Sequence, residues 1–214
     1  MVNTYGLPST TVVGQRLPKE SFYKSFKLTA AQKREFVELI ESLAIVSTIK
    51  EATVRIPPTK DVSEIAVVEV RLRGSEVPEA ALGAVAAQHP LKLVYACLEP
   101  REGLDGGACR FALWRGGQLH SGPWAQVEDQ ALALSGEDLG AMWDGLCAQV
   151  VFGDSDGRRV DERLQVRARI SQLTKELASV TKKHAKEVQP AKRNALFAQK
   201  RALERELAEL KGKA

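Results

Sequence analysis

The sequence predicts an α/β (α+β) domain with a mixed sheet flanked by helices, followed by a C-terminal antiparallel α-helical hairpin (coiled coil). Strand-like and helical patterns are interspersed as far as residue 152. A polar, glycine-containing linker follows at 153–159, and the residues beyond it repeat apolar side chains at heptad spacing. We therefore divide the chain into an α/β body with an N-terminal arm, 1–157, and a basic helical hairpin, 158–214.

The first elements of the body are an arm, two helices and a strand. Residues 1–17 show no periodicity, which indicates an extended arm, and Pro18 suits the start of a short helix. Thr29 is a typical N-cap for a helix over 30–43, where apolar residues recur at helical spacing. The β-branched residues of 45–56 predict a strand or strand-like turns.

The rest of the body continues the mixed pattern. The predicted elements are a strand in 64–74, a helix in 78–89, a strand in 91–100, a hairpin turn at Gly116-Gly117, and a helix in 135–152. Ser135 is the expected N-cap of the last helix.

The tail carries the clearest pattern in the chain. Val166, Ile170, Leu173, Leu177 and Val180 alternate steps of four and three, which is a heptad seam that His184 continues. Pro190 interrupts the helix, and Leu196, Leu203, Leu207 and Leu210 resume the apolar spacing. An antiparallel hairpin explains this pattern most simply, and a kinked rod or pairing with another chain are the alternatives.

The charge is unevenly distributed along the chain. The formal net charge is +4, but residues 158–214 carry 16 Lys/Arg and 7 Asp/Glu. Residues 1–157 hold the remaining 15 Lys/Arg and 20 Asp/Glu. A weakly acidic body joined to a basic tail favours a polyanion or an acidic protein surface as the partner, without choosing between them.

The cysteines and the N-terminus indicate a cytoplasmic location. Cys97, Cys109 and Cys147 are far apart and form no CxxC pair, so neither a disulfide framework nor a zinc site is expected. The first residues lack a basic and apolar signal pattern, and no stretch approaches the roughly 20 apolar residues of a membrane helix. We expect a cytoplasmic protein without a membrane partner.

No complete catalytic motif is present. The sequence lacks GxxxxGK[ST], GxGxxG and GxSxG motifs, and His89 and His120 have no neighbouring metal-ligand pattern. We therefore expect neither a catalytic site nor a cofactor.

One partial motif supports an enzyme alternative. Asp61 precedes a strand that carries Glu69 and Arg71, a pattern similar to the metal-dependent nucleases of the D…ExK type. Two carboxylates could bind Mg²⁺, but Arg71 stands where those enzymes have Lys and cannot share the proton of an attacking water. A half-exposed strand with alternating charges explains the same residues.

The stretch GQRLPKESFYKSF, residues 14–26, mixes basic and aromatic side chains. Phe26 lies four residues after Phe22 and three after Tyr23, so one short helix would bury the rings together. Stacking on nucleic-acid bases needs exposed rings. We interpret the stretch as an anchored arm that presents Arg16 and Lys19.

Basic residues spread over both tail helices could bind a partner. Together with Arg16 and Lys19, the predicted partner-binding residues are Arg163, Arg167, Lys182, Lys183, Lys186, Lys192 and Arg193. Such a hairpin could follow a phosphate backbone without sequence preference. Solvated helix faces are the simpler alternative, which the interleaved glutamates favour.

The chain resembles a bacterial family defined only as a domain of unknown function. The resemblance spans nearly the whole chain and rests on YGLPSTTVVGQRLPKESFY, EIAVVEVRL, LKLVYACLEP, GPW and KEVQPAKRNAL. Its most specific parts are RLPK, residues 16–19, and the Gln-Pro bend of the tail. The resemblance implies genes placed beside DEAD/SNF2-type helicases and site-specific DNA methyltransferases, in restriction or phage-defence loci. It carries over no catalytic residues.

Three functions follow as hypotheses. The first is a non-catalytic accessory or scaffold subunit of a bacterial DNA-modification or anti-phage defence system, which docks to a helicase or methyltransferase and could contact DNA. The second is a Mg²⁺-dependent nuclease using Asp61 and Glu69. The third is a stand-alone, non-specific nucleic-acid-binding module.

Overall fold

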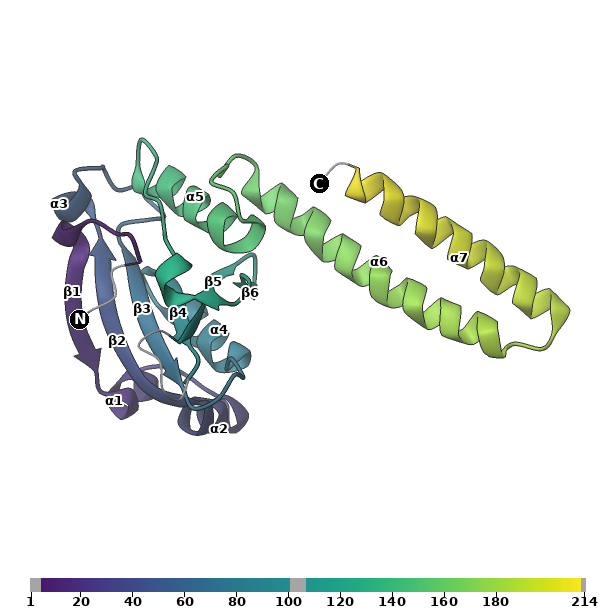
Figure 1. The fold of residues 1–214 in the computed structure, drawn as a ribbon, viewed down its shortest axis with the longest axis horizontal. Helices are drawn as coiled ribbons and strands as arrows, with labels where there is room; N and C mark the ends of the chain where they lie inside the picture. Colours follow the sequence, from purple (N-terminus) through teal and green to yellow (C-terminus); the bar gives the residue numbers. More distant parts are fainter. Residues whose placement is uncertain (1–4, 101–106, 213–214) are drawn as a thin grey trace. The chain divides into compact units, whose positions relative to one another are not determined.

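The computed structural model describes residues 5–100 and 107–212, which form two compact units, residues 1–158 and 159–214 (Figure 1). Residues 1–4 of the expected arm lie outside the described part. The body contains 3₁₀ turns at Ser9–Thr11 and Val127–Asp129, strands β1 (Val12–Leu17), β2 (Ile40–Ile49), β3 (Ile65–Leu72), β4 (Lys92–Leu98), β5 (Ala108–Arg115), β6 (Gln118–Ser121) and β7 (Ala125–Gln126), and helices α1 (Lys19–Lys24), α2 (Ala30–Leu39), α3 (Glu51–Val54), α4 (Glu79–Gln88) and α5 (Leu139–Phe152). The second unit consists of α6 (Val160–Lys186) and α7 (Pro190–Lys211).

The strands form one mixed sheet, which confirms the predicted fold class. Their order is β1-β2-β3-β4-β5-β6, and β7 pairs with the first residues of β5, Ala108 and Cys109. Only β3 and β4 are parallel, and α4 makes the crossover between them. The other neighbouring strands are antiparallel.

One face of the sheet packs against α2 and α4. Alternate residues of β3, from Ala66 to Leu72, lie in this core with Tyr95 of β4. Phe36 of α2 and Leu82 of α4 are fully buried against them. Because side chains alternate along a strand, the odd-numbered residues of β3 point to the opposite face.

The opposite face is covered by α5 and by the N-terminal segment. Arg115 of β5 forms a 2.5 Å ion pair with Asp144 of α5. Tyr5 is fully buried, packs edge-on against Phe111 of β5, and its carbonyl accepts a hydrogen bond from the amide of Leu132. The central strand β3 is therefore buried on both faces.

Turn and cap chemistry confirms several predicted elements. Gly116 and Gly117 both have positive φ, 59° and 84°, as a two-residue hairpin between β5 and β6 requires. Thr29 caps α2, since its hydroxyl accepts the Gln32 amide while the Gln32 side chain accepts the Thr29 amide.

Two predicted boundaries were wrong. The helix over 30–43 ends at Leu39, and Ile40 already belongs to β2, whereas part of the expected strand over 45–56 is the helical turn α3. An irregularity in the β2–β3 pairing between Ile40 and Ser42 lets Ile40 and Leu43 face the same core. A strand with this bulge has the same three-residue apolar spacing as a helix.

The start of the last body helix was also misplaced. The helix begins at Leu139 rather than near Ser135, because Gly136 has a φ of 143°, which no helix contains. Asp138 is the N-cap, and its carboxylate accepts the Ala141 amide at 2.8 Å.

The aromatic cluster expected in the N-terminal stretch is present. Phe22 packs against Phe26, with ring centroids 5.3 Å apart, and both Phe22 and Tyr23 lean on Phe36. The Lys19 ammonium donates hydrogen bonds to the carbonyls of Val37 and Ile40, at 3.1 and 2.7 Å. Lys19 thus supplies hydrogen-bond donors to carbonyl groups at the C-terminal end of α2. Its partial burial and the nearby positive charge of Arg73 lower the pKa of its ammonium group.

The tail is a helical hairpin, which confirms that prediction and excludes the kinked rod. α6 and α7 pack side by side (Figure 1), and Pro190 occupies the first turn of α7, where its missing N–H costs nothing. Across the described ranges, no helix has the length and apolar character needed to cross a membrane.

Replacing Lys19 tests its role at the end of α2. We expect Lys19→Met to lower the free energy of unfolding by about 1–2 kcal/mol, because two carbonyl groups lose a charged donor. Lys24→Met is the control, since Lys24 makes only an exposed ion pair with Glu20 and should cost below about 0.5 kcal/mol. Urea unfolding followed by circular dichroism measures both, and equal losses would contradict the assignment.

Candidate functional site

The hairpin is held by a narrow apolar seam. Leu173 and Val180 of α6 are buried, while Val166, Ile170, Leu177 and His184 are half-buried, as the heptad pattern predicts. The leucines of α7 are also half-buried, and no described residue of α7 is fully buried. Two helices that share so little core leave most of their polar and basic side chains in solvent.

Ion pairs stabilise the half of the hairpin away from the turn. The Arg169 guanidinium donates to Glu206 at 2.9 and 2.6 Å and so joins α6 to α7. Glu204 lies 3.7 Å from both Lys200 and Arg201 on the same helix. The acidic residues of α7 are all in this half, at positions 204, 206 and 209.

The half next to the turn is basic and lacks such pairs. We call the exposed side chains of Lys182, Lys183, Lys186, Lys192 and Arg193 the basic tip. Within the described part of the chain, none of these five residues has an ion-pair partner. Glu187 is the single acidic residue between Lys182 and Arg193. Its carboxylate accepts a hydrogen bond from the Gln189 amide at 2.9 Å within the turn.

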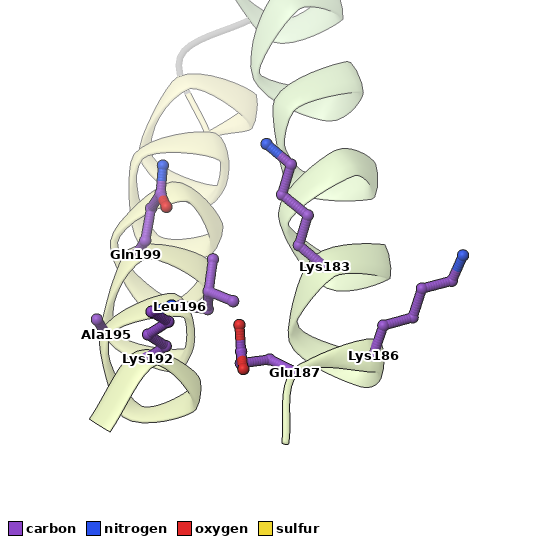
Figure 2. A pocket seen from close by; sticks show the side chains of 7 residues that line it. All are labelled: Lys183, Lys186, Glu187, Lys192, Ala195, Leu196 and Gln199. Atoms are coloured by element: carbon purple, nitrogen blue, oxygen red, sulfur yellow. The ribbon is translucent and has the colours of Figure 1, made fainter. Parts of the chain in front are cut away.

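A shallow hollow of about 560 Å³ lies between the two helices at the tip (Figure 2). Its lining residues are Lys183, Lys186, Glu187, Lys192, Ala195, Leu196 and Gln199. Figure 2 shows the Lys183 and Glu187 side chains reaching toward the space between the helices, while Lys186 points away from it. The hollow offers ammonium groups around a small apolar floor, which suits phosphate or carboxylate groups of a large ligand.

The other predicted partner-binding residues are separate from the tip. Arg163 and Arg167 lie near the start of α6, half-buried and exposed respectively. Arg16 is exposed on the edge strand β1. Lys19 is engaged by the carbonyls of α2, so it is not free to extend toward a partner.

Of the three nuclease-like residues, the structure pairs Glu69 with Arg71 and places Asp61 in the loop before their strand. Asp61 is exposed in the loop before β3, whereas Glu69 is the fifth residue of that strand, about 13 Å along it from Ile65. The Glu69 carboxylate is nearly buried, accepts the Tyr5 hydroxyl at 3.2 Å, and pairs with Arg71 at 2.9 Å. Among the described residues, no cluster of three or more His, Cys, Asp or Glu side chains is placed to hold a metal ion.

Glu69 instead belongs to a polar cluster in which Tyr5 and Cys109 are buried while the Arg71 side chain is 57% exposed. Burial, with Cys109 and Glu69 nearby, raises the pKa of the Tyr5 hydroxyl far above its usual range, so Tyr5 stays a neutral donor. Burial, reinforced by the charge of Glu69, raises the pKa of the Cys109 thiol to about 12. This cluster stabilises the N-terminal segment on the sheet, and the three cysteines are free and buried.

A family model described as a domain of unknown function (DUF4391) matches residues 5–207. The chain belongs to the DUF4391 family. The match covers the sheet, the helices of the body and nearly all of the hairpin, so both units are part of the DUF4391 domain. No curated protein and no solved structure matches the chain significantly.

Sequence reasoning missed two features of this DUF4391 chain. The partner of Glu69 is Tyr5, 64 residues earlier, and no spacing rule connects them. Phe197 is 53% exposed on α7, between basic residues, whereas the rings of the 14–26 stretch pack together on Phe36. The signal for Phe197 was in the sequence, since it falls outside the leucine seam.

Removing the Tyr5 hydroxyl tests the buried cluster. We expect Tyr5→Phe to lower the free energy of unfolding by about 1.5–3 kcal/mol, because the buried carboxylate loses a hydrogen bond. Tyr23→Phe is a matched control, because its ring is only half-buried. Chemical unfolding of both variants decides the point, and a Tyr5→Phe protein as stable as wild type would contradict the role of the bond.

Alkaline unfolding tests the environment of Cys109. A folded pKa near 12 lies above the ordinary value of 9.0, so the buried thiol favours folding fully below pH 9. This contribution falls as the pH rises from 9 to 12, because the unfolded thiol ionises first. Between pH 8 and 10.5, wild type should lose more unfolding free energy than Cys109→Ala. Parallel losses in urea titrations at the two pH values would contradict the shift.

Proposed function

We propose that this chain is a non-catalytic accessory subunit of a bacterial DNA-modification or anti-phage defence system. In this proposal the α/β body is a stable scaffold, and the basic hairpin contacts a helicase or DNA methyltransferase partner. The observation that carries the proposal is the basic tip, five exposed cations with no ion-pair partner among the described residues, on a hairpin that forms its own compact unit.

The interactions of the body support a scaffold role. Glu69 is paired with Tyr5 and Arg71, and the Asp144 carboxylate with Arg115. Catalytic acids and bases usually line a cleft, where they can reach a substrate. Here the buried ionisable groups stabilise packing between the sheet and the segments that cover it.

The character of the hairpin supports a binding role. The two long helices bury only a thin seam, so most of their side chains are exposed to solvent. The acidic and basic residues on these exposed surfaces are separated along the length of the helices. Glutamates pair with arginines in one half, while the basic tip stays unneutralised. Unpaired cations repel each other, so their accumulation is best explained by an anionic partner surface. The choice of a helicase or methyltransferase rests on the gene neighbourhood that the family resemblance implies.

Charge reversal in the full-length chain tests the proposal. The tip variant is Lys183→Glu, Lys186→Glu and Lys192→Glu combined. The control is Lys27→Glu, Lys33→Glu and Lys60→Glu, which changes the net charge equally at exposed positions of the body. Each tagged chain is coexpressed with the helicase and methyltransferase that the family resemblance implies as its gene neighbours, and the captured proteins are quantified.

We expect the tip variant to capture at least about tenfold less partner than wild type, since several charge pairs at the interface are lost. The control should retain capture, and wild-type capture should fall as salt is added. Equal capture by the tip variant and the control would reject the hairpin as the docking element. Capture of neither enzyme by wild type would reject the proposed partners.

A further inference from the structure

Phe197 is the only exposed aromatic residue in the part of the chain that the structure describes. Its side chain is 53% exposed on the surface of α7, outside the leucine seam. The ring leans on His184 of α6, with centroids 6.0 Å apart and planes tilted by 41°. This contact orients the ring while leaving about half of it exposed to solvent, where a flat ligand can reach its face.

Basic residues surround the exposed ring on the same face of the helix. Arg193 and Arg201 lie four residues before and after Phe197, so they are one helical turn away on either side. Arg193 is exposed and unpaired within the described residues. Arg201 lies 3.7 Å from Glu204, which is near the limit of an ion pair, and it remains 71% exposed.

The charge of the wider segment favours a polyanion. Between Leu177 and Leu203 the chain holds seven Lys/Arg residues and one acidic residue. That acidic residue, Glu187, is engaged by the backbone of the turn. A segment with this balance complements a phosphate backbone at every step along its length.

We infer that α7 carries a binding site for single-stranded nucleic acid, in which an unpaired base stacks on Phe197 and phosphates contact Arg193 and Arg201. The two arginines are eight residues apart, which is about 12 Å along a helix, or roughly three to four nucleotides of a stacked strand. The site goes beyond the proposed function, since it adds a nucleic-acid ligand on α7 to the protein partner of the basic tip.

The exposed ring selects a single strand over other anionic ligands. In a duplex the faces of the bases are covered by their neighbours, so Phe197 would have nothing to stack on. The carboxylates of an acidic protein segment would form ion pairs with the lysines of the basic tip. Such a segment would gain no specific contact from an aromatic ring flanked by arginines. Basic residues combined with an exposed aromatic are the usual elements of a sequence-tolerant single-strand site.

Oligonucleotide binding by the purified full-length chain tests the inference. Fluorescence anisotropy compares a labelled 20-nucleotide oligo(dT) with a 20-base-pair duplex, over a series of salt concentrations. Phe197→Leu keeps an apolar side chain against His184 but removes the π-face, and Phe197→Trp enlarges it. Val37→Ala is the matched control, because Val37 is an exposed apolar residue of the body, at 47%. Circular dichroism verifies that each variant keeps its helices.

We expect Phe197→Leu to weaken oligo(dT) binding about tenfold, which corresponds to the loss of one stacked base. Phe197→Trp should bind at least as tightly as wild type, and Val37→Ala should be unchanged. Arg193→Gln should reduce the slope of log affinity against log salt by about 0.7, as expected for one lost phosphate contact on a single strand.

Three results would overturn the inference. The first is Phe197→Leu binding as tightly as wild type, and the second is a duplex binding as tightly as oligo(dT). The third is competition by poly-glutamate as effective as that by oligo(dT), which would indicate an acidic protein surface as the ligand. Because no partner enzyme is present, oligonucleotide binding can fail while partner capture holds, or the reverse, so the two proposals are separable.

Discussion

Strand β3 is buried on both faces, and the rest of the body depends on that burial. Its even-numbered side chains enter the core beneath α2 and α4, and on the other face Ile65 and Val67 are buried while Glu69 accepts a hydrogen bond from Tyr5 of the N-terminal segment. β3 and β4 form the one parallel pair among the described strands, and parallel pairs need a crossover, here made by α4. A central strand of this kind requires covering layers on both sides, which explains why so much of the chain is used to cover one sheet.

Burial of β3 also determines the environment of its one acidic residue. Glu69 lies between Ala44 and Ala96 in the strand register, two small side chains that leave room above the sheet. The Tyr5 hydroxyl and Arg71 compensate the carboxylate there. A buried charge without such partners would cost several kcal/mol. The cluster thus ties the N-terminal segment to the centre of the sheet, and its chemistry is that of packing rather than of an open reactive site.

The hairpin differs from the body, because it buries few side chains and leaves most of them exposed to solvent. Of its seam residues, Leu173 and Val180 are buried and the others are half-buried, and the charges that do not pair across the seam are separated along its length. Packing of α6 on α7 decides which residues face outward, and it leaves Phe197 and the basic tip on the surface. Basic and aromatic residues occur together in two places: in 14–26 the rings pack against Phe36, whereas on α7 the Phe197 ring is exposed.

The sequence by itself determined two tail helices that break at Pro190, the strands at 64–74 and 91–100 and the Gly-Gly turn, because heptad spacing, β-branched runs and paired glycines act locally. That the tail helices fold back on each other was decided by the tertiary structure. The sequence also determined the charge asymmetry between the weakly acidic body and the basic tail. Only the tertiary structure decided that Ile40–Leu43 is a strand, since a bulge and a helix share the same apolar spacing. It alone placed Tyr5 on Glu69 and Lys19 on the end of α2, because contacts between distant residues follow from packing rather than from any periodicity in the chain.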